Sequence, residues 1–481
     1  MSANFFQHPK PFYTIFMLEI WERFGYASLV GLLAVYLTKS FGLKSSDSFV
    51  LYGSFAALVY AFIVVGGFIG DKILGAKRTI VLGLLTLLLG YIFLALNNLD
   101  LVYYAMALIC VGTGLFKSNP SSLLSKCYPP DDDGLMHNAF TLFYMAINIG
   151  SIVGLLLIPS LAHSYGYSTA FGTSAIAIVL ALAVFVGFGF TMKQIGSEAD
   201  KKPLNYGYLL GTIIVVIALV FCVEELLVYL FLSKAIVVLT FLICLIIFIY
   251  LTIKSKSENY AGRMSLALVM MFEAIVYKIA YMQMQTSINF YTINNASHSL
   301  FGIELVPESF QALNPFWVVF LSPILAYYYT KSDGTKFSLS VYNKFSVGMV
   351  SIGLAFICLF ISKYTADSQG IVSGYWLLLS YGLQSLGELL ICAIGIAMVT
   401  QLVPSQLSGF AVGMWWVFLA FGSLLGGFIA SLTSPKGIET TDKMVLLVNY
   451  TNVFFWIGLC ILAFSVFMFC LAPIKARLLA H

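Results

Sequence analysis

Charged residues are scarce in this sequence. Asp, Glu, Lys and Arg make up only 10% of the 481 residues, whereas 60% are hydrophobic. A soluble domain keeps its surface hydrated with roughly a quarter of its residues charged. The composition therefore excludes a soluble globular protein. It predicts a polytopic membrane protein, most of which lies within the bilayer.

Patterns that hold metals, nucleotides or covalent intermediates are also missing. The eight cysteines are scattered without a CxxC pair, and we interpret them as small buried apolar residues. There is no P-loop and no nucleophile–base motif. The net charge of +4 is too small to indicate a nucleic-acid partner. We therefore expect a protein that is not an enzyme and that needs no cofactor or metal.

Apolar runs long enough to cross a bilayer recur along the whole chain, separated by polar or Gly/Pro breaks. They predict fourteen transmembrane helices, at residues 13–38, 50–70, 78–97, 101–125, 137–161, 170–193, 206–228, 233–254, 263–292, 312–330, 340–362, 373–399, 409–432 and 447–472. An even number of spans places both termini on one side. Lys and Arg are concentrated in the segments of that side, so the positive-inside rule predicts cytoplasmic termini. Met1–Pro11 lacks the features of a cleaved signal peptide, and we expect none.

A polar stretch from Met192 to Asn205 follows the sixth span and is predicted to be an interdomain linker. The next two spans have almost no interior polar groups except Glu224 and Glu225, so we expect them to be peripheral. Without them, six helices precede and six follow, which is typical of a transporter built from two halves. The predicted domains are an N-terminal six-helix bundle (1–193), a linker with two extra helices (194–262) and a C-terminal six-helix bundle (263–481).

Three charges lie within five residues of the first span. Glu19, Glu22, Arg23 and Tyr26 are spaced i, i+3, i+4 and i+7, which places them on one stripe of an α-helix. A charge near the bilayer centre costs roughly 2.5–3.5 kcal/mol on insertion scales, so the stripe must face a polar interior. We predict that this side of the first helix holds a proton, an anion or both.

Two opposite charges lie within later spans. Lys117 is late in the fourth span, before Pro120, which is expected to kink the helix. There it can hold a carboxylate, pair with a glutamate, or extend to the interface as a snorkelling lysine. Glu388 lies within the twelfth span and needs a cation. We predict a salt bridge between Lys117 and Glu388 that opens and closes with the cavity; a permanent structural ion pair is the alternative.

The remaining candidates are uncharged. Tyr144 and Asn148 are at i and i+4 in the fifth span, where they offer a hydroxyl and an amide to one space or form a helix–helix hydrogen bond. Gln283 belongs to a polar stretch in the outer half of the ninth span, and Asn314 begins the tenth. Tyr60 lies in the middle of the second span, where packing explains a tyrosine equally well.

Specific segments carry a resemblance to a known family. Gly66–Arg78 resembles the short loop between the second and third helices of the major facilitator superfamily. Within that superfamily the chain resembles the proton-dependent oligopeptide transporters, and among them the bacterial di-/tripeptide permeases. The matching segments are Glu19–Tyr26, Gly112–Asn119, Phe143–Ser151, Gln283–Asn289, Ala312–Trp317 and Leu386–Leu389. The resemblance implies an all-α major facilitator fold, two six-helix bundles plus two extra helices, in a bacterial inner membrane.

The resemblance also implies a function, namely import of di- and tripeptides coupled to protons by alternating access. It assigns proton coupling to Glu19, Glu22 and Arg23. It implies that the partners are peptides, protons and the lipid bilayer, with no nucleic acid, and that the protein is a monomer.

The resemblance further implies how a peptide is held. Arg23 and Lys117 would face the peptide carboxylate, and Asn148, Asn314 and Glu388 would hold its backbone and amine. The substrate-binding residues that the resemblance implies are Arg23, Tyr26, Tyr60, Lys117, Tyr144, Asn148, Gln283, Asn314 and Glu388.

Three positions depart from the family pattern. Ala27 replaces a tyrosine, and Lys278 stands where relatives are usually apolar or aromatic. Val30 replaces an arginine whose usual partner is also missing, because no Asp or Glu occurs from 274 to 303. Ala27 favours the first alternative, a transporter of another small zwitterionic, peptide-like metabolite. The second alternative is a non-transporting peptide receptor, against which the retained glutamates argue.

Overall fold

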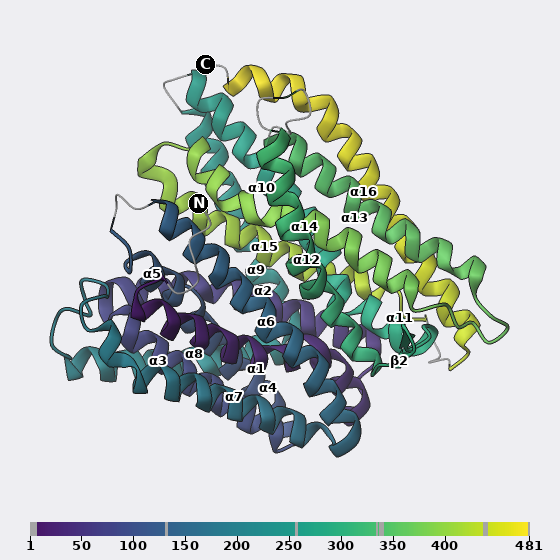
Figure 1. Cartoon of the computed structure of the whole chain (residues 1–481), viewed down its shortest axis with the longest axis horizontal. Helices are drawn as coiled ribbons and strands as arrows, with labels where there is room; N and C mark the ends of the chain where they lie inside the picture. Colours follow the sequence, from purple (N-terminus) through teal and green to yellow (C-terminus); the bar gives the residue numbers. More distant parts are fainter. Residues whose placement is uncertain are drawn as a thin grey trace. The chain divides into compact units, whose positions relative to one another are not determined.

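The computed structural model describes residues 7–129, 133–254, 258–332, 335, 341–435 and 441–479. Helices dominate these residues (Figure 1). The chain divides into two compact units. Unit 1 comprises Met1–Phe41 and Leu58–Ser233, and unit 2 comprises Gly42–Ala57 and Lys234–His481.

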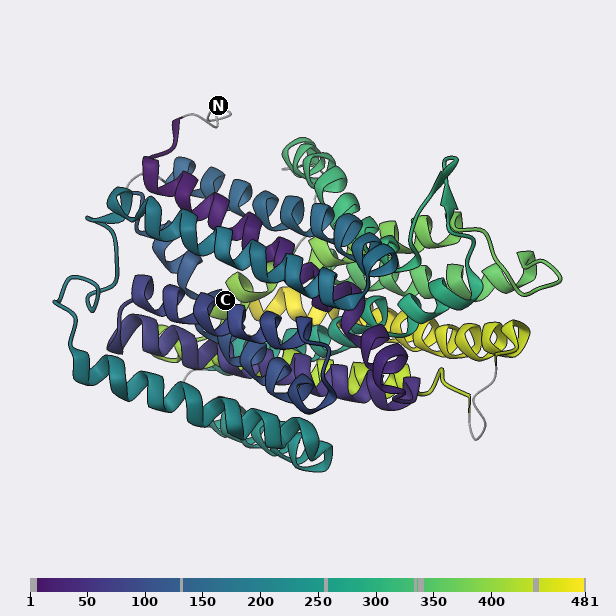
Figure 2. The same ribbon diagram turned by 90° about the horizontal axis from the view of Figure 1, so that it is seen from below.

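Unit 1 is a bundle of long helices. Its elements are α1 (Lys10–Phe41), the second half of α2 (Ser45–Phe68), a π-helical turn (Ile69–Ile73), α3 (Ala76–Ala95), α4 (Leu99–Lys117), α5 (Asn119–Ser125), α6 (Asp133–Tyr165), α7 (Tyr167–Gly187), a 3-10 turn (Gly189–Met192) and α8 (Tyr206–Val228). Helix α1 packs along α6 and α7, and α3 packs along α4 and α7. Both views show α1, in dark purple, beside the blue helices of this bundle (Figure 2).

The contact between α1 and α6 depends on small residues. A Cβ on Gly154 would lie 2.6 Å from the Cβ of Ala27 and 2.7 Å from the carbonyl oxygen of Phe24. A Cβ on Gly150 would lie 2.4 Å from the carbonyl oxygen of Ile20. Only glycine allows the two backbones to approach this closely. Ala27 is buried in this contact.

Helix α4 ends beside the charged stripe of α1. It stops at Lys117, and α5 begins two residues later at Asn119 with Pro120 in its first turn. Proline lacks the N–H that would continue the hydrogen-bond ladder, and it fits the first turn of a new helix. The predicted kink is therefore a break, which places Lys117 at the end of α4.

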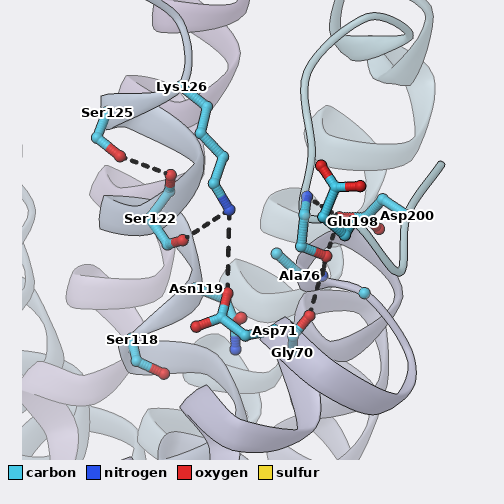
Figure 3. Close-up of polar contacts among 12 residues, drawn as sticks. Gly70, Asp71, Ala76, Ser118, Asn119, Ser122, Ser125, Lys126, Glu198 and Asp200 are labelled. Atoms are coloured by element: carbon cyan, nitrogen blue, oxygen red, sulfur yellow. Dashed lines mark hydrogen bonds and ion pairs between the residues drawn. The ribbon is translucent and has the colours of Figure 1, made fainter. Parts of the chain in front are cut away.

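The polar linker folds back onto the start of α3 (Figure 3). Ser197 Oγ donates to the carbonyl oxygen of Gly70 at 3.1 Å and accepts from the N–H of Ala76 at 3.3 Å. Asp200 Oδ1 accepts from the N–H of Lys77 at 3.2 Å. These bonds satisfy N–H groups that the first turn of a helix leaves without intrahelical partners. The predicted linker thus also caps α3.

Unit 2 is likewise helical. It contains the first half of α2, most of α9 (Leu230–Ile253), α10 (Glu258–Gln285), α11 (Ser287–Asn295), β1 (Ser299–Leu300), β2 (Ile303–Glu304), a 3-10 turn (Pro307–Ala312), α12 (Leu313–Ser332), α13 (Val341–Ile361), a 3-10 turn (Ser362–Thr365), α14 (Tyr375–Leu402), a 3-10 turn (Ser405–Leu407), α15 (Ser408–Ser431) and α16 (Lys443–Leu479). Helix α13 packs on α14 and α16, and α10 packs on α14 and α15. Strands β1 and β2 form one antiparallel hairpin.

The first half of α2 packs within unit 2. A Cβ on Gly53 would lie 2.8 Å from the Cα of Gly427 on α15, so the two helices touch backbone to backbone. Tyr52 donates its hydroxyl to Gln285 Oε1 at 3.0 Å, and the rings of Phe49 and Phe290 lie 4.7 Å apart. This contact joins α2 to α10, α11 and α15 through apolar and neutral polar groups.

The sequence prediction of a polytopic helical membrane protein is confirmed. Among the described residues, thirteen helices are long and apolar enough to cross a membrane. Helix α14, Tyr375–Leu402, corresponds to the remaining predicted span, 373–399.

The two extra helices carry large exposed apolar side chains, such as Phe221 and Phe231. Helix α8 packs on α4, with the rings of Phe221 and Tyr104 6.0 Å apart. Helix α9 stacks Phe241 on Phe421 of α15 at 4.2 Å. Each helix therefore adds to the outside of a different unit.

Candidate functional site

The charged stripe of α1 is a closed ion cluster in unit 1. Arg23 donates from Nε to Glu22 Oε2 at 2.5 Å and from Nη2 to Glu22 Oε1 at 2.8 Å. Both side chains are buried, and Glu22 is only 1% exposed. A paired, two-pronged guanidinium–carboxylate contact is among the strongest polar contacts in proteins. Burial on this scale is tolerable because each charge has an opposite charge beside it.

Glu19 lies on the other side of the same guanidinium. Its Oε1 is 3.5 Å from Arg23 Nε, and its Oε2 accepts no hydrogen bond within the described structure. Glu19 also interacts electrostatically with Lys117, at the end of α4. Two carboxylates thus share one arginine and one lysine. A proton that neutralises either acid frees a cation for another anion.

Two tyrosines flank these cations. The guanidinium of Arg23 lies over the ring of Tyr26, 4.8 Å from its centre. The Nζ of Lys117 lies 5.4 Å from the centre of the Tyr60 ring. Aromatic faces attract cations, so both rings hold a cation without neutralising its charge. Tyr60 therefore lies beside a cation of this cluster, and its role in a peptide pocket stays a prediction.

Helix α6 contributes Tyr144 and Asn148. The amide of Asn148 donates to the carbonyl oxygen of Tyr144 at 2.8 Å, which is a bond along its own helix. Asn148 is buried, whereas 37% of Tyr144 is exposed. This bond holds the Asn148 amide along its own helix, and the space that the Tyr144 hydroxyl and the Asn148 amide are predicted to share stays a prediction.

Unit 2 holds a different kind of polar group. Asn314 of α12 donates from Nδ2 to Glu388 Oε2 at 2.8 Å and to Ser385 Oγ at 3.0 Å, both on α14. Ser385 in turn donates to the backbone oxygen of Asn314 at 3.1 Å. The neutral amide of Asn314 thus orients the carboxylate of Glu388. The hydroxyl of Ser385, one helical turn before Glu388 on α14, holds Asn314 in place.

Gln283 is fully buried in the packing of α10 against α15. Its Nε2 donates to the carbonyl oxygens of Ile279 and Gly426 at 2.9 and 3.0 Å, and its Oε1 accepts from Ser287 at 2.7 Å. These bonds engage both ends of its amide. Its assignment to a peptide pocket stays a prediction.

Lys278, which the sequence leaves unexplained, is also buried on α10. Its Nζ lies over the ring of Tyr281, 4.5 Å from the ring centre. The aromatic face stabilises a buried cation at this position.

Two buried tyrosines lie near Glu22 and Glu388, and the sequence did not indicate them. Tyr91 of α3 interacts electrostatically with Glu22 and Arg23. Tyr277 of α10 interacts with Glu388 and hydrogen-bonds Cys392. Each is one tyrosine in a long apolar run, so its spacing alone gives no signal.

Lys117 and Glu388 belong to different units, and the salt bridge predicted between them stays a prediction.

Comparison with known proteins decides the family. The sequence profile of the POT family, designated PTR2, matches residues 77–445. The chain belongs to the POT family. Its curated relatives include dipeptide and tripeptide permease B of Photorhabdus asymbiotica, which is 44% identical over 99% of this chain and 98% of that permease. The permease B of Salmonella typhimurium is 42% identical over 98% of this chain and 96% of its own length.

Solved structures agree with the POT assignment. Tetrameric PepTSo2 superposes with a TM-score of 0.87 at 29% identity, covering 97% of this chain and 98% of that one. A structure determined to explain substrate recognition in proton dependent oligopeptide transporters gives a TM-score of 0.86 at 28% identity, covering 97% and 99%. The POT family and its transporter fold, both expected from the sequence motifs, are confirmed.

Proposed function

We propose that this POT-family protein is a proton-coupled symporter that imports di- and tripeptides by alternating access. The observation that carries the proposal is the cluster of Glu19, Glu22 and Arg23. A buried cation held by two acids changes partner when one acid takes up a proton. The curated relatives, which are dipeptide and tripeptide permeases, support peptides as the substrate.

The coupling step is an exchange of partners at Arg23. With both acids ionised, Glu22 occupies two donors of the guanidinium and Glu19 lies 3.5 Å from it. Protonation of an acid weakens its hold, so the donors become free for the peptide carboxylate. The state in which Arg23 holds the peptide carboxylate is favoured only when a proton and a peptide are both bound. Such differential affinity is what allows a ligand to shift a conformational equilibrium.

A short peptide is a zwitterion, so its two ends need opposite charges. We assign its carboxylate to Arg23 and Lys117, which are cations flanked by tyrosine rings. We assign its amine to Glu388 and its backbone to Asn148 and Asn314, whose amides donate and accept hydrogen bonds. The pocket-lining residues in this proposal are Tyr26, Tyr60, Tyr144 and Gln283.

The Lys117–Glu388 salt bridge remains part of the proposal as a gate that a bound peptide competes with. The family resemblance implies an outer salt bridge between an arginine at position 30 and an acid on α10. This chain has Val30 and no Asp or Glu from 274 to 303, so it lacks that salt bridge. We propose that the neutral contact of the first half of α2, including the bond from Tyr52 to Gln285, takes its place. Cytoplasmic termini and a monomeric state also remain proposals.

The decisive experiment is uptake of labelled dialanine into proteoliposomes with and without an inward proton gradient. A gradient of one pH unit supplies ~1.4 kcal/mol per proton, enough for tenfold accumulation at one proton per peptide. Wild type should accumulate dialanine. Glu22→Gln should lose accumulation and retain exchange of preloaded peptide. The matched control is Glu198→Gln, because Glu198 is an exposed glutamate paired with Lys201, and it should behave as wild type.

Each other outcome has a defined meaning. Gradient-driven accumulation by Glu22→Gln would move coupling away from this residue. A folded wild type that accumulates none of several di- and tripeptides would favour another small zwitterionic metabolite, the alternative that Ala27 suggests. Binding without any transport would identify a receptor.

A further inference from the structure

An apolar groove runs between α3, α7 and α8 of unit 1. Its volume is about 490 Å³. Six of the side chains along its walls are Val81, Leu85, Phe185, Val186, Leu209 and Ile213. Leu85 and Val186 are 43% and 60% exposed, so the groove opens on the outer surface of the bundle. All three helices are membrane-spanning, and an open apolar groove on such a surface is filled by hydrocarbon rather than water.

Two cations close one end of this groove. Arg78 donates to the carbonyl oxygens of Leu74, Ala199 and Lys202 at 3.1, 3.3 and 2.8 Å. Lys77 Nζ donates to a carbonyl oxygen of the linker at 2.9 Å. These acceptors are neutral, and no carboxylate of the described chain forms an ion pair with either side chain. Both cations are held in place with their charge uncompensated.

A second cavity continues beyond these cations. It measures about 1050 Å³ and shares Arg78 and Leu204 with the groove. Three lysines, Lys72, Lys126 and Lys202, line it. The apolar groove therefore leads past Arg78 into a basic, solvent-accessible space.

The acids around this cavity already have partners. Asp71 lies 3.9 Å from Lys126, as Figure 3 shows, and Glu198 lies 2.6 Å from Lys201. Asp200 accepts backbone N–H groups at 2.9 and 3.2 Å. Lys72, Arg78, Lys126 and Lys202 line the cavity against two acids, Asp71 and Glu198, so its lining carries a net positive charge. An occupant that brings an anion is favoured here, and one that brings an ammonium is not.

We infer that this is a binding site for an anionic glycerophospholipid. One acyl chain lies in the groove between α3, α7 and α8. The phosphate lies against Lys77 and Arg78, and the headgroup occupies the basic cavity. The inference depends on the two sites being continuous: the groove alone suits any hydrocarbon, and the cavity alone suits any anion. A bound lipid would join α3, α8 and the linker, whatever the protein transports.

The test compares two lipids with the same acyl chains, palmitoyl-oleoyl phosphatidylglycerol and phosphatidylcholine, added to the full chain in detergent micelles. Native mass spectrometry counts the bound lipids. Phosphatidylglycerol should bind on the order of tenfold more tightly, because both lipids carry a phosphate but only phosphatidylcholine adds a quaternary ammonium, which the cations of the headgroup cavity repel. Arg78→Gln should reduce this preference to near unity. Lys44→Gln is the matched control, since it removes an exposed cation that lines neither cavity and forms no ion pair within the described residues, and it should keep the preference.

A second variant tests the groove, and it keeps the inference testable if Arg78→Gln does not fold. Val186→Trp fills the groove from an exposed position and leaves every charge in place, so it should weaken both lipids. If Arg78→Gln does not fold, Lys202→Gln and Val186→Trp decide. Equal binding of the two lipids by wild type would overturn the inference. The inference would also be overturned if Val186→Trp and the charge variant both kept the wild-type preference for phosphatidylglycerol. Displacement of the lipid by inorganic phosphate alone would overturn it as well.

Discussion

The two units hold their acids in different ways: Glu19 and Glu22 of unit 1 are buried, and Glu388 of unit 2 is half-buried. In unit 1, Glu22 is bonded by a guanidinium, and Glu19 lies beside the same cation. In unit 2, Glu388 accepts a hydrogen bond from the neutral amide of Asn314, which also donates to Ser385. Removing the cation from a buried ion pair leaves an uncompensated charge, whereas removing an amide leaves a missing hydrogen bond. Unit 1 should therefore respond strongly to changes of charge, and unit 2 should respond more to changes of hydrogen bonding.

The largest effect is expected for Arg23→Ala. This change leaves two buried carboxylates without the cation between them, and breaking a buried pair in this way typically costs about 3–5 kcal/mol of unfolding free energy. Chemical unfolding in detergent micelles at neutral pH measures the loss. The neutral triple variant Glu19→Gln, Glu22→Gln and Arg23→Gln should recover most of it, because none of the three charges then remains. An Arg23→Ala protein as stable as wild type would show that the cluster is solvated.

A smaller effect is expected for Asn314→Ala. It removes the amide that donates to Glu388 and Ser385 in a half-buried position, and a hydrogen bond to a charged group contributes about 1.5–3 kcal/mol. Asn314→Asp is nearly the same size and places a second carboxylate at hydrogen-bonding distance from Glu388. At neutral pH it should be less stable than Asn314→Ala, since like charges repel at this distance. The comparison between units is wrong if the aspartate is tolerated as well as asparagine. The same unfolding assay measures both variants.

The spacing of charges made the unit 1 site predictable. Glu19, Glu22, Arg23 and Tyr26 lie on one helical stripe, and a single helix fixes their mutual geometry. The family motifs likewise led to the correct family and fold. Helix spans were predictable because hydrocarbon thickness sets their length. Pro120 predicted a kink near Lys117, and the structure has a full break between α4 and α5 there.

Contacts between helices were not predictable in the same way. Tyr91 reaches the cluster from another helix, and the packing of Gln283 on Gly426 depends on where α15 lies. The same holds for the linker, whose Asp200 caps a helix more than a hundred residues earlier. Such contacts arise from tertiary packing, which the period of one segment does not encode. The groove between α3, α7 and α8, with Arg78 at one end, was likewise not predictable from the sequence, because it depends on how these helices pack.

The smallest effect is expected at His8, another buried ionisable group of unit 1, which lies outside the membrane-spanning helices. His8 Nδ1 is 2.8 Å from the hydroxyl of Tyr128, and its ring stacks on Phe12 at 4.4 Å. Burial lowers the pKa of His8 below its ordinary value of 6.5, although a hydrogen bond with Asn138 partly opposes this shift. Below pH 6.5 the unfolded chain therefore binds more protons than the folded chain.

Stability should accordingly fall as the pH drops from 6.5 toward the folded pKa of His8, and be unaffected by this group above 6.5. One proton contributes at most ~1.4 kcal/mol per pH unit. His8→Gln, which stays neutral, should flatten the loss measured by unfolding between about pH 8 and about pH 5.5. The pH dependence of peptide uptake should persist in this variant, because we assign it to Glu19 and Glu22. If His8→Gln removes the pH dependence of uptake instead, proton coupling does not reside in the cluster alone, and the contrast between the two units no longer explains it.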